Sequence, residues 1–225
     1  MTFTLFPLLV ALLAQLGQIQ VPSPVGYVND FSNVIPAAAE ARINAIVQDV
    51  RTKSGGEIVV VTMTDLRGRD PADVAREIGR QWQVGAKGGP GDRARNAGVI
   101  IMVVPKETSP DGRGYTRIET GLGSEGFLTD ATTGVIQDEA IPLLRQGDYG
   151  GALELMTARV AQRFASEFQF QLDTTVQLPV QRPTGRTLPT GGINPIFIFL
   201  LIFIVLSMLN SGRRGRRGGC GGGGC

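Results

Sequence analysis

The feature that most constrains the fold is the apolar run Ile193–Leu209, which reads INPIFIFLLIFIVLSML. A helix that packs on a soluble core carries a polar stripe, and no polar residue interrupts this run between Ile196 and Leu206. Its length lies at the short end of the roughly 17–25 residues that span a bilayer. We therefore predict a transmembrane helix at residues 193–209 that anchors the chain in the lipid bilayer.

The residues around this run predict how the chain is oriented. Four arginines follow it directly, at Arg213, Arg214, Arg216 and Arg217. Because basic residues collect on the cytoplasmic side of a span, residues 210–225 are predicted to be an Arg/Gly-rich cytoplasmic tail. Residues 169–192 are predicted to be a flexible linker. The chain then crosses the cell membrane once, with its main domain on the extracytoplasmic (periplasmic or extracellular) side.

A second apolar run lies at Phe3–Leu16 and has the length of a signal-peptide core. No lysine or arginine precedes it, and no clean A-x-A cleavage site follows it. We predict that residues 1–20 are a signal peptide or an N-terminal anchor, and both alternatives stay open.

The composition excludes several kinds of site. The chain has no histidine, which removes Ser-His-Asp and Cys-His catalysis and His-ligated zinc. Its two cysteines, Cys220 and Cys225, lie in the tail. Residues 21–180 carry 16 Lys and Arg against 20 Asp and Glu, so no basic face for nucleic acid is expected.

Hydrophobic spacing in the middle of the chain alternates between helix and strand patterns. The run GVIIMVV at Gly98–Val104 is continuous, as in a strand covered on both faces, whereas Tyr115–Thr120 alternates and is predicted to lie nearer an edge. This alternation predicts one α/β sandwich around a mixed sheet, at residues 26–168. The expected helices are 36–53, one that starts at Asp70-Pro71, one from Thr129 or Asp130 to about Leu144, and Tyr149–Phe168; the expected strands are Glu57–Thr64, Gly98–Val104 and Tyr115–Thr120, with a loop at 85–97.

The segment Gly121–Gly126, GLGSEG, matches the G-x-G-x-x-G pattern of dinucleotide sites. In those sites a helix begins within the glycines and points its N–H groups at the pyrophosphate. Here the next helix cap comes later, at Thr129-Asp130, and Glu125 would place a carboxylate where the phosphates should lie. We therefore expect no nucleotide, and interpret the segment as a tight turn that presents Glu125.

Four acidic residues lie at turns and helix caps, namely Asp30, Glu125, Asp130 and Asp148. Oxygen ligands gathered from several loops suit a hard cation such as Ca²⁺. The alternative is that these carboxylates only cap helices and shape turns. No nucleophile–base pair is apparent, so no catalytic residue is predicted.

At these residues the chain resembles the TPM-domain family, whose bacterial members also combine a signal, a domain, a transmembrane helix and a Gly-rich tail. The matching motifs, in order, are Val28-Asn29-Asp30-Phe31, Glu57–Thr62, Asn96-Ala97-Gly98-Val99, Arg117-Ile118-Glu119 before Gly121–Gly126, Leu128-Thr129-Asp130 and Gly147-Asp148-Tyr149.

The resemblance implies a three-layer α/β/α sandwich around a mixed, mostly parallel sheet. It also implies Ca²⁺ bound by loop oxygens, with Asn96 added to the four carboxylates as a metal ligand. Two functions follow from it. One is an accessory domain that binds or helps assemble and maintain membrane or envelope proteins. The alternative is a metal-dependent acid phosphatase that uses the loop carboxylates.

Overall fold

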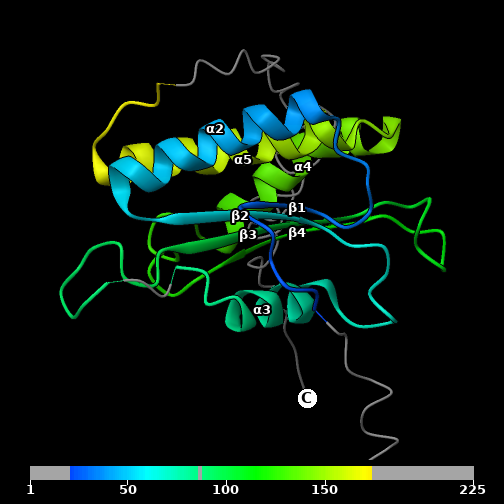
Figure 1. The fold of residues 1–225 in the computed structure, drawn as a ribbon, viewed down its shortest axis with the longest axis horizontal. Helices are drawn as coiled ribbons and strands as arrows, with labels where there is room; N and C mark the ends of the chain where they lie inside the picture. The colour runs from blue at the N-terminus through cyan, green and yellow to red at the C-terminus, as the bar shows by residue number, and fades with distance from the viewer. Residues whose placement is uncertain (1–20, 86–87, 174–225) are drawn as a thin grey trace, which may run out of the picture. The chain divides into compact units, whose positions relative to one another are not determined.

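The computed structural model describes residues 21–85 and 88–173 (Figure 1). The predicted export segment at 1–20, the transmembrane span at 193–209 and the tail at 210–225 lie outside the described residues. Among the helices of the described part, none has both the length and the apolar composition that crossing a bilayer requires.

A four-stranded sheet in the order β1-β2-β3-β4 forms the centre of the fold. The strands β1, β2 and β3 run parallel, and β4 runs antiparallel to β3. We call the end where the three parallel strands begin the amino end of the sheet, and the other the carboxyl end. The strands are β1 at Val28–Asp30, β2 at Glu57–Thr62, β3 at Gly98–Val104 and β4 at Tyr115–Thr120.

Helices cover both faces of this sheet, as Figure 1 shows. On one face lie α2, α4 and α5, and on the other lies α3. The described helices are α2 at Ala37–Ser54, α3 at Pro71–Gln81, α4 at Asp130–Gln146 and α5 at Tyr149–Phe168. The predicted α/β fold around a mixed sheet is confirmed.

The strand β3 explains why two hydrophobic cores form. All seven of its residues are buried, and successive side chains point to opposite faces. Val99, Ile101 and Val103 pack with α2, α4 and α5. Ile100 and Met102 pack with α3. A continuous apolar strand is therefore required, because neither face of the sheet meets water.

The helix boundaries follow from capping residues that the sequence contains. The Asp70 side chain accepts a hydrogen bond from the Ala72 N–H at the start of α3. The Thr129 hydroxyl does the same for the Thr132 N–H at the start of α4. Both caps lie where the sequence predicts them.

Some boundaries differ from the predicted ones, and one strand was not predicted. The strand β2 ends at Thr62, two residues before the predicted Thr64. The helix α4 continues past Leu144 to Gln146, where Gly147 ends it with a left-handed backbone (φ 78°). The strand β1 was not predicted as a strand, because its three residues are too few to show a periodic pattern.

The connections β1-α2-β2 and β2-α3-β3 have opposite handedness. Both step to the next parallel strand in the same direction across the sheet, yet α2 and α3 lie on opposite faces. Such crossovers are right-handed in about 98% of cases, so one of these two is an exception. Because α2, α4 and α5 all lie on the other face, α3 is the one described helix on its own face, where it packs against β3 and β4.

Candidate functional site

The turn after β4 packs backbone to backbone against the segment before β3, at the amino end of the sheet. The Gly121 N–H donates to the Gly98 carbonyl (2.7 Å), and the Gly123 N–H donates to the Asn96 carbonyl (3.1 Å). A Cβ atom at Gly123 would lie 2.2 Å from the Arg95 carbonyl oxygen, closer than any real contact. Gly121 and Gly123 are therefore needed for close packing between two chain segments.

Ser124 belongs to the same packing. Its hydroxyl donates to the Gly98 carbonyl (3.3 Å), its N–H donates to the Gly121 carbonyl, and its side chain is fully buried. These contacts hold the turn 121–126 in one conformation. Ser124 is thus a structural residue.

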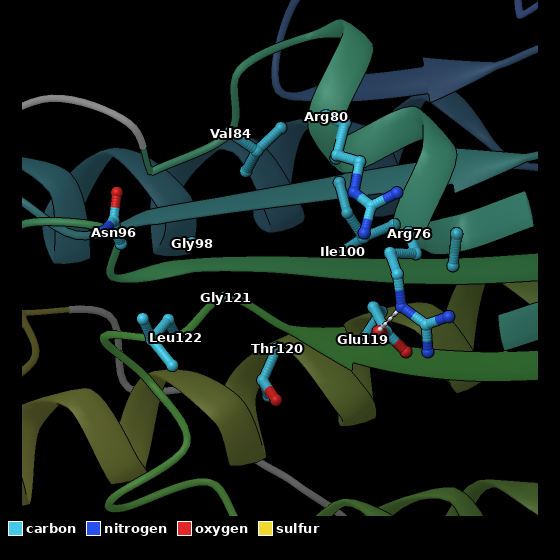
Figure 2. Close-up of a pocket in the computed structure, with 12 residues that line it drawn as sticks. Arg76, Arg80, Val84, Asn96, Gly98, Ile100, Glu119, Thr120, Gly121 and Leu122 are labelled. Carbon is cyan, nitrogen blue, oxygen red and sulfur yellow. Dashed lines mark hydrogen bonds and ion pairs between the residues drawn. The ribbon is translucent and has the colours of Figure 1, made fainter. Parts of the chain in front are cut away.

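A hollow of about 340 Å³ lies beside this turn, between α3 and the end of β4. Figure 2 shows Arg76 and Arg80 of α3 on one side of it and Thr120, Gly121 and Leu122 on the other. The Arg76 guanidinium donates to the Glu119 carboxylate across the hollow (3.2 Å). The hollow therefore has one paired arginine, and Arg80 also lines it.

A second, more polar hollow of about 430 Å³ shares Arg76, Glu119 and Thr120 with the first. Glu125 and Asp130 line it. Arg117 donates to the second oxygen of the Glu119 carboxylate (2.8 Å), so this carboxylate lies between two guanidinium groups. The pairing leaves Glu125 and Asp130 as the exposed anionic groups of the hollow.

Leu122 lies in the turn beside these hollows with 75% of its surface exposed. Both neighbours, Gly121 and Gly123, are fixed by backbone hydrogen bonds, so the turn fixes the backbone position from which this side chain projects. We call this region the amino-end surface and define it by the residues that surround the two hollows: Arg76, Arg80, Asn96, Arg117, Glu119, Leu122, Glu125 and Asp130.

The five predicted metal ligands divide between the two ends of the sheet. Asn96, Glu125 and Asp130 belong to the amino-end surface. Asp30 ends β1 and therefore lies at the carboxyl end. Asp148 lies there too, since the next residues of α5 pack against Pro36, just before α2. The two ends of the sheet are roughly 20 Å apart, which is the length of β3.

The two aspartates at the carboxyl end have local hydrogen-bond partners. Asp30 accepts hydrogen bonds from the Thr62 hydroxyl group and from two backbone N–H groups of the turn after β1. Asp148 caps α5 by accepting from the Gly151 N–H (2.9 Å). Within residues 21–85 and 88–173, no three acidic side chains lie close enough together to hold one metal ion. Calcium binding by a subset of these residues stays a prediction.

Sequence reasoning missed the arginines and Leu122. A signal for Arg76 and Arg80 was available, because they are four residues apart and face the same side of α3. Their partner could not be found in this way, since Glu119 is 43 residues further along the chain. Leu122 lies inside the motif that the sequence interpreted only as a turn.

A family model and one solved structure agree with this fold. A family model described as TPM domain matches residues 28–163. The search of curated proteins found no match to the chain. The NMR structure of the N-terminal domain of a protein from P. gingivalis is similar, with a TM-score of 0.54 and 26% identity, over 64% of this chain and 85% of that one. The N-terminal domain of a Corynebacterium glutamicum protein matches with a TM-score of 0.47 and 21% identity, over 66% and 88%.

Proposed function

This chain belongs to the TPM-domain family, and on that premise we propose that its α/β domain is a membrane-tethered accessory domain. The domain acts outside the cytoplasm, where it binds membrane or envelope proteins and helps to assemble or maintain them. The amino-end surface makes the contact with these partner proteins.

The observation that carries the proposal is the position of Leu122. A single exposed leucine needs no explanation by itself. Leu122, however, is held by a turn with fixed backbone hydrogen bonds and lies beside a hollow lined by Arg80. An apolar side chain with charged groups around it is the usual composition of a protein-binding centre and its rim, and little backbone entropy is lost when a preorganised turn binds.

The contacts of Asp173, which follows α5, support the same surface. After α5, the Asp173 carboxylate pairs with Lys53 (2.7 Å), and the Asp173 N–H donates to the Asp49 carboxylate. Lys53 lies in the last turn of α2, which precedes the start of β2. A linker at residues 169–192 that leads to a membrane span would thus begin at the amino end.

In this proposal the Glu125 and Asp130 carboxylates bind Ca²⁺, and the Asn96 amide oxygen is a weaker ligand. Ca²⁺ accepts irregular oxygen sets and completes its shell with carbonyls and water. Calorimetry on the full chain in detergent tests this: Asp130→Asn and Glu125→Gln should each lower the calcium affinity, whereas Asp148→Asn should not. If only Asp148→Asn or Asp30→Asn lowers it, the ion belongs to the carboxyl end.

Recovery of partner proteins tests the proposal itself. The tagged full chain is crosslinked in its own membrane, with and without Ca²⁺, and the captured proteins are identified by mass spectrometry. Leu122→Ser should reduce recovery of a specific partner about fivefold or more, because truncated central anchors typically cost more than about 1 kcal/mol of binding. Val135→Ser is the matched control, since Val135 is also exposed (58%) but lies on α4 outside both hollows. Equal losses from both variants would contradict the proposal.

A metal-dependent phosphatase is the alternative, and the polar hollow is the observation in its favour. Arg76 and Arg117 lie there with Glu125 and Asp130, and guanidinium groups bind phosphate in a bidentate manner. A metal ion held by carboxylates can activate water without a histidine. Against it, both arginines are already paired with Glu119. Release of phosphate from p-nitrophenyl phosphate that Asp130→Asn abolishes without unfolding the domain would replace the accessory role.

A further inference from the structure

A separate cavity of about 350 Å³ lies at the carboxyl end of the sheet, away from the amino-end surface. It lies between the β3–β4 hairpin, the last turns of α4 and the first residue of α5. Its volume falls within the range of about 300–1,000 Å³ that is usual for ligand sites. We propose that this cavity binds the free C-terminal carboxylate of an extended peptide whose last side chain is apolar.

The walls of the cavity suit an apolar side chain. Val103 of β3, Ile141 and Leu144 of α4 and the ring of Tyr149 line it. Val103 and Tyr149 are buried, and the two α4 residues are partly buried. A leucine or valine side chain placed here would bury apolar surface at about 25 cal/mol per Å².

The rim of the cavity carries two cations, Lys106 and Arg145. Arg145 forms no ion pair within the described residues, and the Lys106 ammonium is 3.8 Å from the Glu107 carboxylate, a loose contact. The Tyr149 hydroxyl donates to Glu107, which lowers the pKa of that carboxyl, so Glu107 is charged at neutral pH. Lys106 and Arg145 are the charged residues that line the cavity itself, so its lining is net positive and attracts a carboxylate.

The edge of β4 distinguishes a peptide from other amphipathic anions. The Ile118 N–H points away from β3 and donates to the Gln137 side chain (3.0 Å). Because strand residues alternate, the Thr116 backbone groups point outward on the same side, and Thr116 lines the cavity. An added strand could pair there over one or two residues, which is how several domains hold peptide C-termini. Gln137 blocks pairing further along the edge.

Fluorescence anisotropy on the full chain in detergent tests this, with a fluorescein-labelled hexapeptide that ends in leucine. The free acid should bind at least about tenfold more tightly than the same peptide with a C-terminal amide, because the neutral amide lacks the negative charge that pairs with the two cations. Arg145→Gln should weaken binding of the acid about tenfold or more. The control Arg163→Gln removes the same charge from an exposed position on α5 and should leave binding unchanged.

A further variant and a competing ligand keep the proposal open to contradiction. Thr116→Pro removes the outward N–H without breaking a bond to β3, and should weaken the peptide but not competing dodecanoate. Equal affinity for acid and amide, unchanged binding in Arg145→Gln, or binding of dodecanoate alone would each overturn the proposal. So would the absence of saturable peptide binding up to about 1 mM, the weakest affinity that a specific site usually shows.

Discussion

Replacing Gly123 by alanine should destabilise the domain by about 2–4 kcal/mol. The added Cβ would lie 2.2 Å from the Arg95 carbonyl oxygen and within 3 Å of two more backbone atoms. Backbone cannot rotate away as a side chain can, so the segment before β3 must move by about 1 Å to reach ordinary contact distances. Overpacking of this kind costs about 1–3 kcal/mol, and loss of the hydrogen bond from Gly123 to the Asn96 carbonyl adds about 0.5–1.5 kcal/mol.

Urea unfolding followed by tryptophan fluorescence measures this effect on the full chain in mild detergent. Trp82 is the single tryptophan of the chain and is partly buried against Phe31, so its signal reports on the α/β domain. With a urea dependence of about 2 kcal/mol per M, the midpoint should fall by about 1–2 M.

The matched control lies three residues further along the same turn. A Cβ atom at Gly126 would meet nothing within 4 Å, so Gly126→Ala should leave the free energy of unfolding unchanged or raise it by up to about 1 kcal/mol. If Gly123→Ala lies within about 0.5 kcal/mol of the wild type, the turn is not packed as described. The same follows if the two variants lose equal stability.

Three further predictions concern the rest of the domain. Asp30→Asn should lower the free energy of unfolding by about 1–3 kcal/mol, seen as a lower urea midpoint, because three hydrogen bonds lose their charged acceptor. Burial and the hydrogen bond to Glu107 raise the pKa of Tyr149 to about 12. As the pH rises, the unfolded chain therefore loses this proton before the folded chain does. The contribution of Tyr149 to the free energy of unfolding is complete below pH 10 and should fall by up to about 3 kcal/mol between pH 10 and 12. Tyr149→Phe should flatten that decline in urea titrations. Gln137→Ala exposes the Ile118 N–H on the β4 edge, and sedimentation should show more self-association than in the wild type.

The elements of the fold were largely predictable because hydrophobic spacing and capping are local. The seven apolar residues of β3 and the caps at Asp70 and Thr129 each depend on neighbours within a few positions. The exception is β1, whose three residues show no period and are held by pairing with β2. Its strand character comes from contacts about 32 positions away in sequence, which a local pattern cannot reveal.

The grouping of the candidate site was less predictable because it depends on strand direction. Turns in this fold alternate between the two ends of the sheet, so residues at successive turns are not neighbours in space. The connection at residues 105–114 leads β3 directly into an antiparallel β4, which sends Glu125 and Asp130 to the amino end. Asp30 and Asp148 lie at the other end. Tracing the direction of each strand along the sequence would have assigned these two pairs to opposite ends of the sheet.

Site-specific photocrosslinking at position 122 tests the central claim most directly. A benzophenone amino acid replaces Leu122 in the full chain, and the protein is irradiated in its own membrane. The amino-end surface predicts one dominant crosslinked membrane or envelope protein, which the same group at the exposed Ala45 of α2 does not capture. Capture of the same proteins from both positions, or of none from position 122, would contradict the claim that this surface binds a partner.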